Sequence, residues 1–242
     1  MITSLPCLVS TTVKTKKTET KYPDWLNALT YLYPNKVLCP NSAQCFNDCL
    51  KASGRLTMNK NKMVQRTKLY FQDFELFYSI LFGELCKTFE KAVRGKKQFA
   101  YRPNGTSDDD LIVKRLLALP KNKRPCHILY DYTKIFTRVL EYSENPDYHL
   151  TFSFDGTNTS DAAFLLENSI ANVSVIFDTK RGEALPEIFH INNKPYKVID
   201  ADIDDLRHLD ESQVICGLRA KGKATKNDNG FVVSAKTTGV YA

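Results

Sequence analysis

From about residue 98 onward, the chain alternates short apolar runs with segments of helical pattern, and this alternation restricts the fold more than any other feature. Strands that alternate with helices indicate an α/β fold with a largely parallel sheet. Around six or seven such units predict a partial or complete β/α barrel of the TIM type, with an open doubly wound sheet as the alternative. The apolar runs lie at Phe99–Arg102, His127–Tyr130, Tyr148–Phe152, Val173–Phe177, Tyr196–Ile199 and Val214–Leu218, and helical patterns lie at Asp108–Leu119, Thr159–Ile170 and Asp204–Leu209.

The preceding part of the chain adds one more strand and one long helix to this prediction. The run Leu29–Tyr33 is apolar and aromatic and is stopped by Pro34, which is typical of a strand. A helical pattern follows over residues 59–94, and its apolar face is formed by Phe74, Phe77, Leu81, Leu85 and Phe89. With 242 residues, of which 43% are hydrophobic, the chain is long enough for one sizeable core. We therefore expect a Thr- and Lys-rich N-terminal extension over residues 1–28 and a single barrel-like domain over residues 29–242.

Three cysteines, Cys39, Cys45 and Cys49, occur within eleven residues directly after the first predicted strand. Thiolates are preferred ligands of iron–sulfur clusters and of zinc, so the C-x5-C-x3-C spacing indicates a metal site. A closed structural site takes four protein ligands, whereas three ligands leave one position open for a substrate or a cofactor. The other four of the seven cysteines are scattered singly, which disfavours a disulfide framework and fits a reducing compartment.

Polar side chains follow several of the predicted strands at their carboxyl ends, where active sites of parallel α/β folds gather. We expect them to share one rim with the cysteine loop. Catalytic roles are predicted for Asp108, Asp131 and Lys134. Binding of a cofactor or substrate is predicted for Arg102, Asn104, Ser107, Ser153, Arg219 and Lys221. Asp155 is expected on the same rim.

Simpler interpretations exist for several of these residues. Ser107, taken alone, is better explained as the cap of the following helix, and Asp131 with Lys134 could form a local ion pair of little energetic value. Lys221-Gly-Lys223 lacks the other residues of a Walker A loop, which disfavours nucleotide hydrolysis. His208 lies in a polar segment that we expect to be exposed, whereas His149 lies in a strand candidate. A solvated acidic turn is the favoured interpretation of Asp200, Asp202, Asp204 and Asp205.

The positive charge is concentrated in the first hundred residues, which hold 16 Lys and Arg against 7 Asp and Glu. Such a segment could meet the phosphate backbone of a nucleic acid, although short lysine runs are more often solvated surface. No apolar run approaches the roughly 18 residues of a membrane helix, so we expect no membrane contact. We therefore keep nucleic acid as a candidate partner of residues 1–100.

Several ordered sequence blocks together resemble one family, the phage gene-88-type proteins, over roughly residues 29–233. The resemblance implies a viral origin and work inside an infected host cell, and so a place in the host cytoplasm, but it does not imply a particular reaction. The blocks are Cys39-Pro with Cys45 and Cys49-Leu, Ser53-Gly-Arg55, Arg66-Thr-Lys68, Arg102-Pro-Asn-Gly-Thr-Ser-Asp108, Tyr130-Asp-Tyr-Thr-Lys134, Tyr148-His-Leu-Thr-Phe-Ser153, Asp204-Asp-Leu-Arg-His-Leu-Asp210, Gly217-Leu-Arg-Ala-Lys-Gly-Lys-Ala224 and Gly230-Phe-Val-Val233.

At the level of the fold, a three-cysteine loop after the first strand of a β/α barrel is similar to the radical S-adenosylmethionine enzymes. This resemblance implies a [4Fe–4S] cluster on Cys39, Cys45 and Cys49, with S-adenosylmethionine on the remaining iron and an unknown substrate. The spacing differs, since that superfamily has C-x3-C-x2-C. One alternative is a nucleic-acid-binding or host-interaction protein with structural zinc or no metal. Another is a metal-free protein in which the cysteines serve packing.

Overall fold

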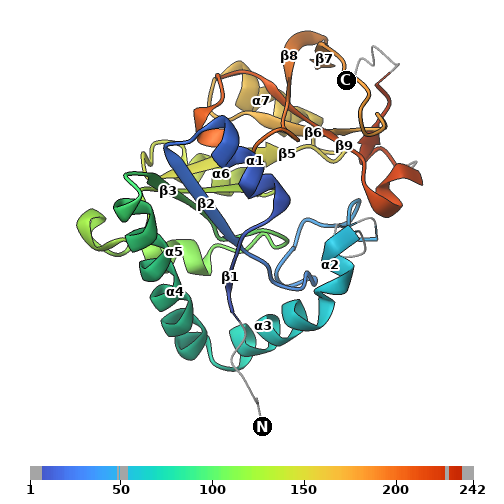
Figure 1. Ribbon diagram of the computed structural model, residues 1–242. Helices are drawn as coiled ribbons and strands as arrows, with labels where there is room; N and C mark the ends of the chain where they lie inside the picture. Colours follow the sequence, from blue (N-terminus) through green and yellow to red (C-terminus); the bar gives the residue numbers. More distant parts are fainter. Residues whose placement is uncertain (1–6, 48, 50–53, 227–228, 236–242) are drawn as a thin grey trace.

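The computed structural model describes residues 7–47, 49, 54–226 and 229–235, and it shows a mixed α/β fold (Figure 1). The α/β class and the largely parallel sheet predicted from the sequence are confirmed. The outer ends of the two predicted segments, residues 1–6 and 236–242, lie outside the described residues. The strands are β1 (Val9–Ser10), β2 (Trp25–Thr30), β3 (Gln98–Arg102), β4 (Ile128–Thr133), β5 (Tyr148–Ser153), β6 (Val173–Phe177), β7 (Ile188–Ile191), β8 (Lys194–Asp200), β9 (Ile215–Arg219) and β10 (Val232–Val233).

Helices occupy most of the connections between these strands. The described α-helices are α1 (Val13–Lys21), α2 (Gly54–Met58), α3 (Lys60–Gln72), α4 (Phe74–Arg94), α5 (Leu111–Leu117), α6 (Phe136–Tyr142) and α7 (Thr159–Glu167). Short 3-10 turns are η2 (Lys121–Lys123), η3 (Arg207–Leu209) and η4 (Gly222–Lys226). The predicted N-terminal extension thus supplies β1, α1 and the start of β2. The long predicted helix is two helices, because the chain leaves the helical conformation at Asp73, whose carboxylate caps α4 by accepting from Leu76 N.

The ten strands form one open sheet in the order β1-β2-β3-β4-β5-β6-β9-β8-β7, with β10 added beside β6. All neighbours pair in parallel except β1 with β2 and β7 with β8, which pair antiparallel. The prediction of a complete barrel is wrong, because β1 and β7 are the two ends of the strand order and do not pair with each other in the described part of the chain. The sheet therefore keeps two edges.

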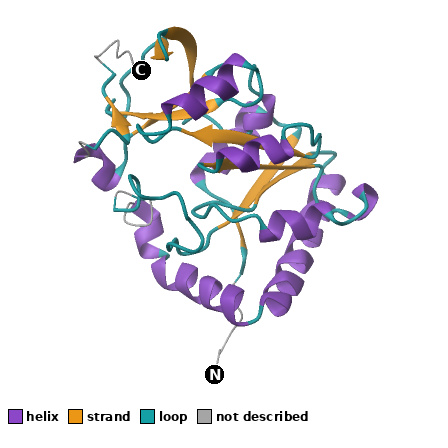
Figure 2. Cartoon of the chain, turned by 180° about the vertical axis from the view of Figure 1, so that it is seen from behind, coloured by secondary structure: helices purple, strands orange, loops and turns teal. Residues whose placement is uncertain are grey.

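From β1 to β6, the order of the strands in the sheet is the order along the chain. Crossovers between parallel strands are right-handed, so successive crossovers that advance in one direction place their helices on the same face. Helices α4, α5, α6 and α7 belong to these connections and cover one face, onto which Figure 2 looks, whereas α3, which precedes α4, contributes residues both to this core and to the pocket. The opposite face is left without a layer of crossover helices.

The alternation of side chains along the strands separates an apolar face from a polar one. Phe99, Phe152 and Val175 point to the helix-covered face and join its core with Phe77, Leu81, Leu116 and Leu165 from the helices. Asn27, Tyr130 and Thr151 alternate with these residues and point to the other face. We call this second surface the pocket face.

Part of the pocket face is covered by α1 and by the segment around η3. Thr18 of α1 accepts a hydrogen bond from Asp205 N at 3.0 Å, and Lys21 pairs with Asp204 at 2.7 Å. Leu206 packs there in a small second core with Ala100 and Tyr130. The covered part lies toward the amino ends of the strands, so the carboxyl ends stay open.

Candidate functional site

A pocket of about 830 Å³ occupies the open part of the pocket face. Its floor is formed by strand residues that share this face, including Leu29, Arg102, Tyr132, Ser174 and Leu218. Its walls come from the cysteine loop, α3, the start of α1 and the loops that follow the strands. A pocket of this size at the carboxyl ends of parallel strands is the usual position of an active or binding site in α/β proteins.

Eleven of the twelve residues predicted as site residues line this one pocket. The remaining one, Asp131, does not, because strand alternation turns its side chain to the helix-covered face. The eleven are Cys39, Cys45, Cys49, Arg102, Asn104, Ser107, Asp108, Lys134, Ser153, Arg219 and Lys221. Asp155 is not among the lining residues and accepts hydrogen bonds from the backbone and hydroxyl of Thr157.

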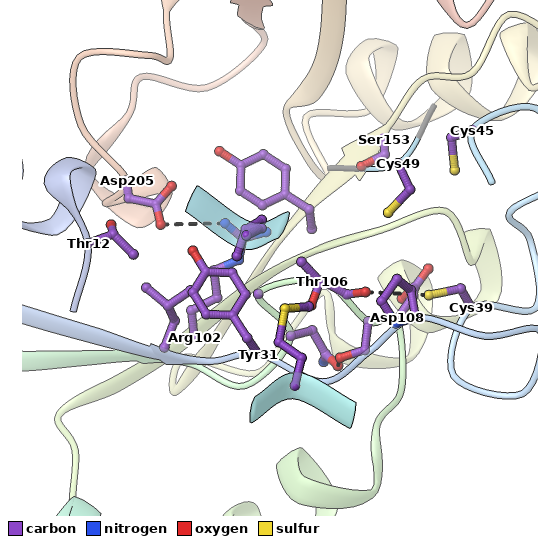
Figure 3. A pocket seen from close by; sticks show the side chains of 18 of the residues that line it. Thr12, Tyr31, Cys39, Cys45, Cys49, Arg102, Thr106, Asp108, Ser153 and Asp205 are labelled. Carbon is purple, nitrogen blue, oxygen red and sulfur yellow. Dashed lines mark hydrogen bonds and ion pairs between the residues drawn. The ribbon is translucent and has the colours of Figure 1, made fainter. Parts of the chain in front are cut away.

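The three cysteines lie together at one end of the pocket, which we call the cysteine end, and Arg102, Tyr31 and Asp205 lie at the other, the basic end (Figure 3). All three thiols are free of disulfides. Cys39 donates to the carbonyl of Thr106 at 3.7 Å, and Cys45 donates to Ser42 O at 3.8 Å. Among the described residues, no three His, Cys, Asp or Glu side chains are grouped as a complete set of metal ligands. The thiols thus share a wall of the pocket without a closed ligand set.

Burial of the thiol, followed by the nearby carboxylate of Asp108, raises the pKa of Cys39 to about 12. Cys49 and Cys45 raise this pKa further, and the ammonium group of Lys134 lowers it. The three cysteines are therefore close enough to influence one another electrostatically. Lys134 is the nearby cation, and its ammonium group lies 5.3 Å from the centre of the Phe231 ring.

The loop after β3 is organised by Asn104, whose side chain is buried. Its amide donates to Asp131 Oδ2 at 2.9 Å and to the Asp109 carbonyl at 2.7 Å, and its oxygen accepts from Ser107 at 2.7 Å. The expected helix-capping role of Ser107 is wrong, because α5 begins after Asp110 and the Ser107 hydroxyl is directed to Asn104 instead. Asn104 and Ser107 therefore shape the pocket wall through bonds within the loop.

Asp108 and Asp131 support this loop from two sides. Asp108 accepts from Arg138 at 2.6 Å and from Lys134 N at 2.9 Å. Its own N–H donates to Leu38 O at 2.7 Å, which ties the loop to the start of the cysteine segment. Burial raises the pKa of Asp108, and the Arg138 guanidinium opposes that shift. Burial also raises the pKa of Asp131, to about 7, against the opposing effects of Arg102 and Asn104.

At the basic end, Asp205 joins two cations beside the pocket floor. Lys14 approaches one of its carboxylate oxygens at 2.8 Å, and Arg102 approaches the other at 3.5 Å. The guanidinium of Arg102 also stacks over the Tyr132 ring, 4.5 Å from its centre. Burial raises the pKa of Asp205, but Lys14 and Arg102 more than compensate, so the net shift is strongly downward. Asp205 is therefore a buried carboxylate that stays ionised.

Arg219 and Lys221 line the pocket and form ion pairs with aspartates at the end of β8 and in the turn that follows it. Arg219 pairs with Asp200 at 2.9 Å, and Lys221 pairs with Asp202 at 2.6 Å. Ser153 accepts from Ser174 at 3.3 Å at the end of β5. These contacts leave Lys134 as the predicted lysine that makes no ion pair with any described carboxylate.

Sequence reasoning missed several pocket residues. The expected solvated acidic turn is wrong for Asp204 and Asp205, which are both buried and paired. The expected exposure of His208 is also wrong, since both of its ring nitrogens are buried. Tyr31 and Arg66 line the pocket as well, from a segment interpreted as a strand and from one interpreted as a helix. The local pattern Asp204-Asp-Leu-Arg207 carried one signal, because an arginine three residues after an aspartate can form an ion pair with it, as Arg207 does with Asp204 at 2.6 Å.

Several cations of the basic first hundred residues are engaged within the described part of the chain. Lys14 and Lys21 pair with Asp205 and Asp204, and Lys97 lies 3.7 Å from Glu19. Lys62 and Arg66 of α3 line the pocket, Lys62 at an exposed position and Arg66 at a buried one. Within the described part of the chain, no helix has both the length and the apolar character needed to cross a membrane.

Comparison with known proteins gives a single family assignment. No curated protein and no solved structure matches the chain significantly. The family model described as Gene product 88 matches residues 8–235, which contain all residues that line the pocket except Cys7, the cysteine segment and every described strand of the sheet. The chain therefore belongs to the Gene product 88 family of bacteriophage proteins.

Proposed function

We propose that the protein is an iron–sulfur enzyme whose cluster is held by Cys39, Cys45 and Cys49 and whose substrate binds in the adjoining pocket. The observation that carries the proposal is that all three thiols of one short loop line the same end of a large pocket. In an infected cell the protein would act in the host cytoplasm, where thiols stay reduced. The proposal extends to chemistry of the radical S-adenosylmethionine type.

The donor set fits this group. Three soft thiol ligands, free of disulfides, would leave one iron position for a small molecule. A bound [4Fe–4S] cluster would supply one-electron chemistry, and S-adenosylmethionine is the cofactor that suits its open iron. The C-x5-C-x3-C segment has longer spacings than the radical enzymes, so its loop needs a different path around the irons. Zinc is the alternative metal for the same thiols.

The arrangement of the sheet supports the comparison with radical enzymes. Parallel strands β2 to β6 follow one another in chain order, with helices α4 to α7 on one face and the pocket, which α3 helps to line, on the other. A partial β/α barrel has this same division between an outer helix layer and an inner site. The cysteine segment follows β2, the first of these parallel strands.

The side chains of this chain would prepare the pocket for such chemistry. Ligand thiols must lose their protons, and the high pKa of Cys39 means that metal binding would release a proton there. The positive charge of Lys134 favours the thiolate form. The Asn104 network would hold the loop between β3 and α5 in place against the cysteine segment, through the bond from Asp108 N to Leu38 O.

Anaerobic reconstitution with iron and sulfide tests the proposal. We expect bound iron and sulfide with broad absorbance near roughly 400 nm in the wild-type protein, and loss of most of both in Cys45→Ala. Cys86→Ala is the matched control, because Cys86 lies on α4 and is not a pocket residue. The proposal is contradicted if the wild-type protein binds no iron, or if Cys45→Ala binds as much iron as the wild-type protein.

The second candidate function is binding of nucleic acid or of a host protein, with structural zinc or no metal at the cysteines. The net positive charge of the first hundred residues favours it. A salt series with duplex and single-stranded DNA distinguishes the two candidates, because binding through phosphates weakens steeply as salt rises. Binding without salt dependence, or no binding, would count against this candidate.

A further inference from the structure

The basic end of the pocket contains a buried cation that makes no ion pair with any described carboxylate. Arg66 is 7% exposed and lines the pocket from α3. Its guanidinium donates to Ser10 Oγ at 3.2 Å and to Tyr31 O at 3.5 Å, and its Nε is buried without a hydrogen-bond partner in the described part of the chain. No described carboxylate lies within ion-pair distance of it. A buried, unpaired guanidinium is costly, so it is retained where a ligand supplies the missing charge.

Further donors come to the same end from other elements. Arg102 reaches the pocket from β3, and Tyr31 from the loop after β2. The pKa of the Tyr31 hydroxyl is raised by burial, while Arg102 and Arg66 both act to lower it. That hydroxyl therefore lies within the electrostatic reach of both guanidinium groups. Arg66 contacts the backbone carbonyl of Tyr31, and the Tyr31 hydroxyl makes no hydrogen bond to any described residue, so it can donate to a ligand.

The N-terminus of α1 adds to the positive potential at this end. Thr12 and Val13 line the pocket, and Ser10, which accepts from Arg66, precedes them by two and three residues. Thr12 caps α1 by accepting from Thr15 N, and the N–H groups between these two residues have no partner within the helix and favour an anion. Lys14 and Arg102 share Asp205, and Arg102 also lies 3.9 Å from Asp131, so these carboxylates are engaged by other cations and neither of them pairs with Arg66.

We propose that Arg66, Arg102 and Tyr31 form an oxyanion subsite that binds a phosphate group of the molecule held in this pocket. Donors arrive from a helix, a strand and a loop, which suits a tetrahedral dianion better than a planar carboxylate, because one guanidinium fork can already satisfy a carboxylate. The substrate class is accordingly a phosphorylated compound. The inference rests on the proposed function only in taking this pocket as the substrate site.

Calorimetric titration of metal-free protein with pyrophosphate tests the subsite independently of the cysteines. We expect saturable binding that weakens as salt rises, with affinity at least tenfold lower in Arg66→Gln and two- to fivefold lower in Tyr31→Phe. Arg115→Gln is the matched control and should bind like the wild-type protein, because Arg115 pairs with Glu75 on the helix-covered side and is not a pocket residue.

Two results would overturn the subsite: no pyrophosphate binding by the wild-type protein, or equal affinity in wild type and Arg66→Gln. Succinate that binds as tightly as pyrophosphate would overturn the assignment to phosphate. Should circular dichroism show that Arg66→Gln does not fold, Tyr31→Phe and Arg66→Lys decide the question, and both must then weaken binding. Iron analysis is done on separate samples, so failure at the cysteines and failure at the subsite give different results.

Discussion

The two faces of the sheet are built from adjacent residues of the same strands, yet they hold the molecule together in different ways. On the helix-covered face, Phe152 and its neighbours bury apolar surface against the helices. On the pocket face, the next residue, Thr151, is equally buried but its hydroxyl has no hydrogen-bond partner among the described residues. One face is optimised for packing, and the other keeps polar groups that packing alone would not select.

This difference indicates that alternate residues of each strand serve different purposes, stability on the helix-covered face and binding on the pocket face. Asn27, Tyr130 and Asp205 form a buried polar chain on the pocket face, in which the Tyr130 hydroxyl accepts from Asn27 and donates to Asp205. Such groups lose hydration on folding, and the hydrogen bonds that they make to one another offset this cost. The comparison therefore predicts that truncation of apolar side chains on the helix-covered face strongly lowers the free energy of unfolding. Changes of polar side chains on the pocket face are predicted to change it in either direction.

The largest expected effect comes from the helix-covered face. Phe152→Ala should lower the free energy of unfolding by about 3–5 kcal/mol, because it removes a fully buried ring and leaves a cavity. Urea denaturation followed by circular dichroism measures the change. A loss below about 1 kcal/mol would show that the helix layer is loosely packed and would break the comparison.

The next effect concerns buried charge on the pocket face. Asp205→Asn should cost about 3 kcal/mol, because it leaves Lys14 and Arg102 without their shared carboxylate. Glu75→Gln, which removes an exposed pair with Arg115, should cost less than about 1 kcal/mol. If the two variants unfold at the same urea concentration, the buried network adds nothing beyond an ordinary surface pair.

Acid should weaken the pocket face through His149 and His208. Burial lowers the pKa of each to about 4, and Arg207 adds to this effect. Between pH 6.5 and 4 the unfolded chain then binds more protons than the folded one, so stability falls as pH falls, by roughly 2 kcal/mol per histidine at pH 5. His149→Gln should reduce the loss between pH 7 and pH 5 by about that amount in paired urea titrations.

Two carboxylates act in the opposite direction on acidification. Burial raises the pKa of Asp131 to about 7 and that of Asp210 to about 6, so the folded protein takes up these protons first and gains stability. The difference between wild type and His149→Gln isolates the histidine contribution from theirs. An unchanged pH dependence in the variant would show that His149 is already protonated in the folded protein.

The smallest expected effect is an unchanged or slightly increased free energy of unfolding, whereas Phe152→Ala and Asp205→Asn lower it. Thr151→Val should leave the free energy of unfolding unchanged or raise it by about 0.5–1 kcal/mol, because it replaces an unpaired buried hydroxyl with a methyl group of similar size. Thermal unfolding at fixed protein concentration can resolve the change. Destabilisation by more than about 1 kcal/mol would reveal a hydrogen-bond partner, such as a bound water, for that hydroxyl.

The periodicity of apolar residues predicted much of the fold. Strands β3 and β6 fall within one residue of the runs expected at Phe99–Arg102 and Val173–Phe177, because each is a short buried segment with clear turns beside it. Helix α1 was missed, since its sequence Val13-Lys-Thr-Lys-Lys-Thr-Glu-Thr-Lys21 has no apolar stripe and it packs through Thr15 and Thr18. Closure of a barrel is a property of the two end strands, which local patterns do not determine.

The site was predictable where its residues follow strands directly. Arg102, Lys134 and Ser153 were placed correctly in the pocket, because carboxyl ends of parallel strands meet at one edge. Asp131 was not placed correctly. The expected strand His127–Tyr130 ends before it, whereas β4 is displaced by a few residues and contains it, so its side chain points to the other face. Arg66 and Asp205 reach the pocket only through tertiary packing of distant segments.

The order of strands at the far edge of the sheet has a consequence for the time course of folding. Strand β9 lies between β6 and β8 although it follows both in the chain, so the β7–β8 hairpin has no place in the main sheet until β9 has docked. We expect this hairpin to be assembled late and to open first. Amide exchange checks this: amides of β8 should exchange faster than those of β4, and equal protection would contradict a stepwise assembly.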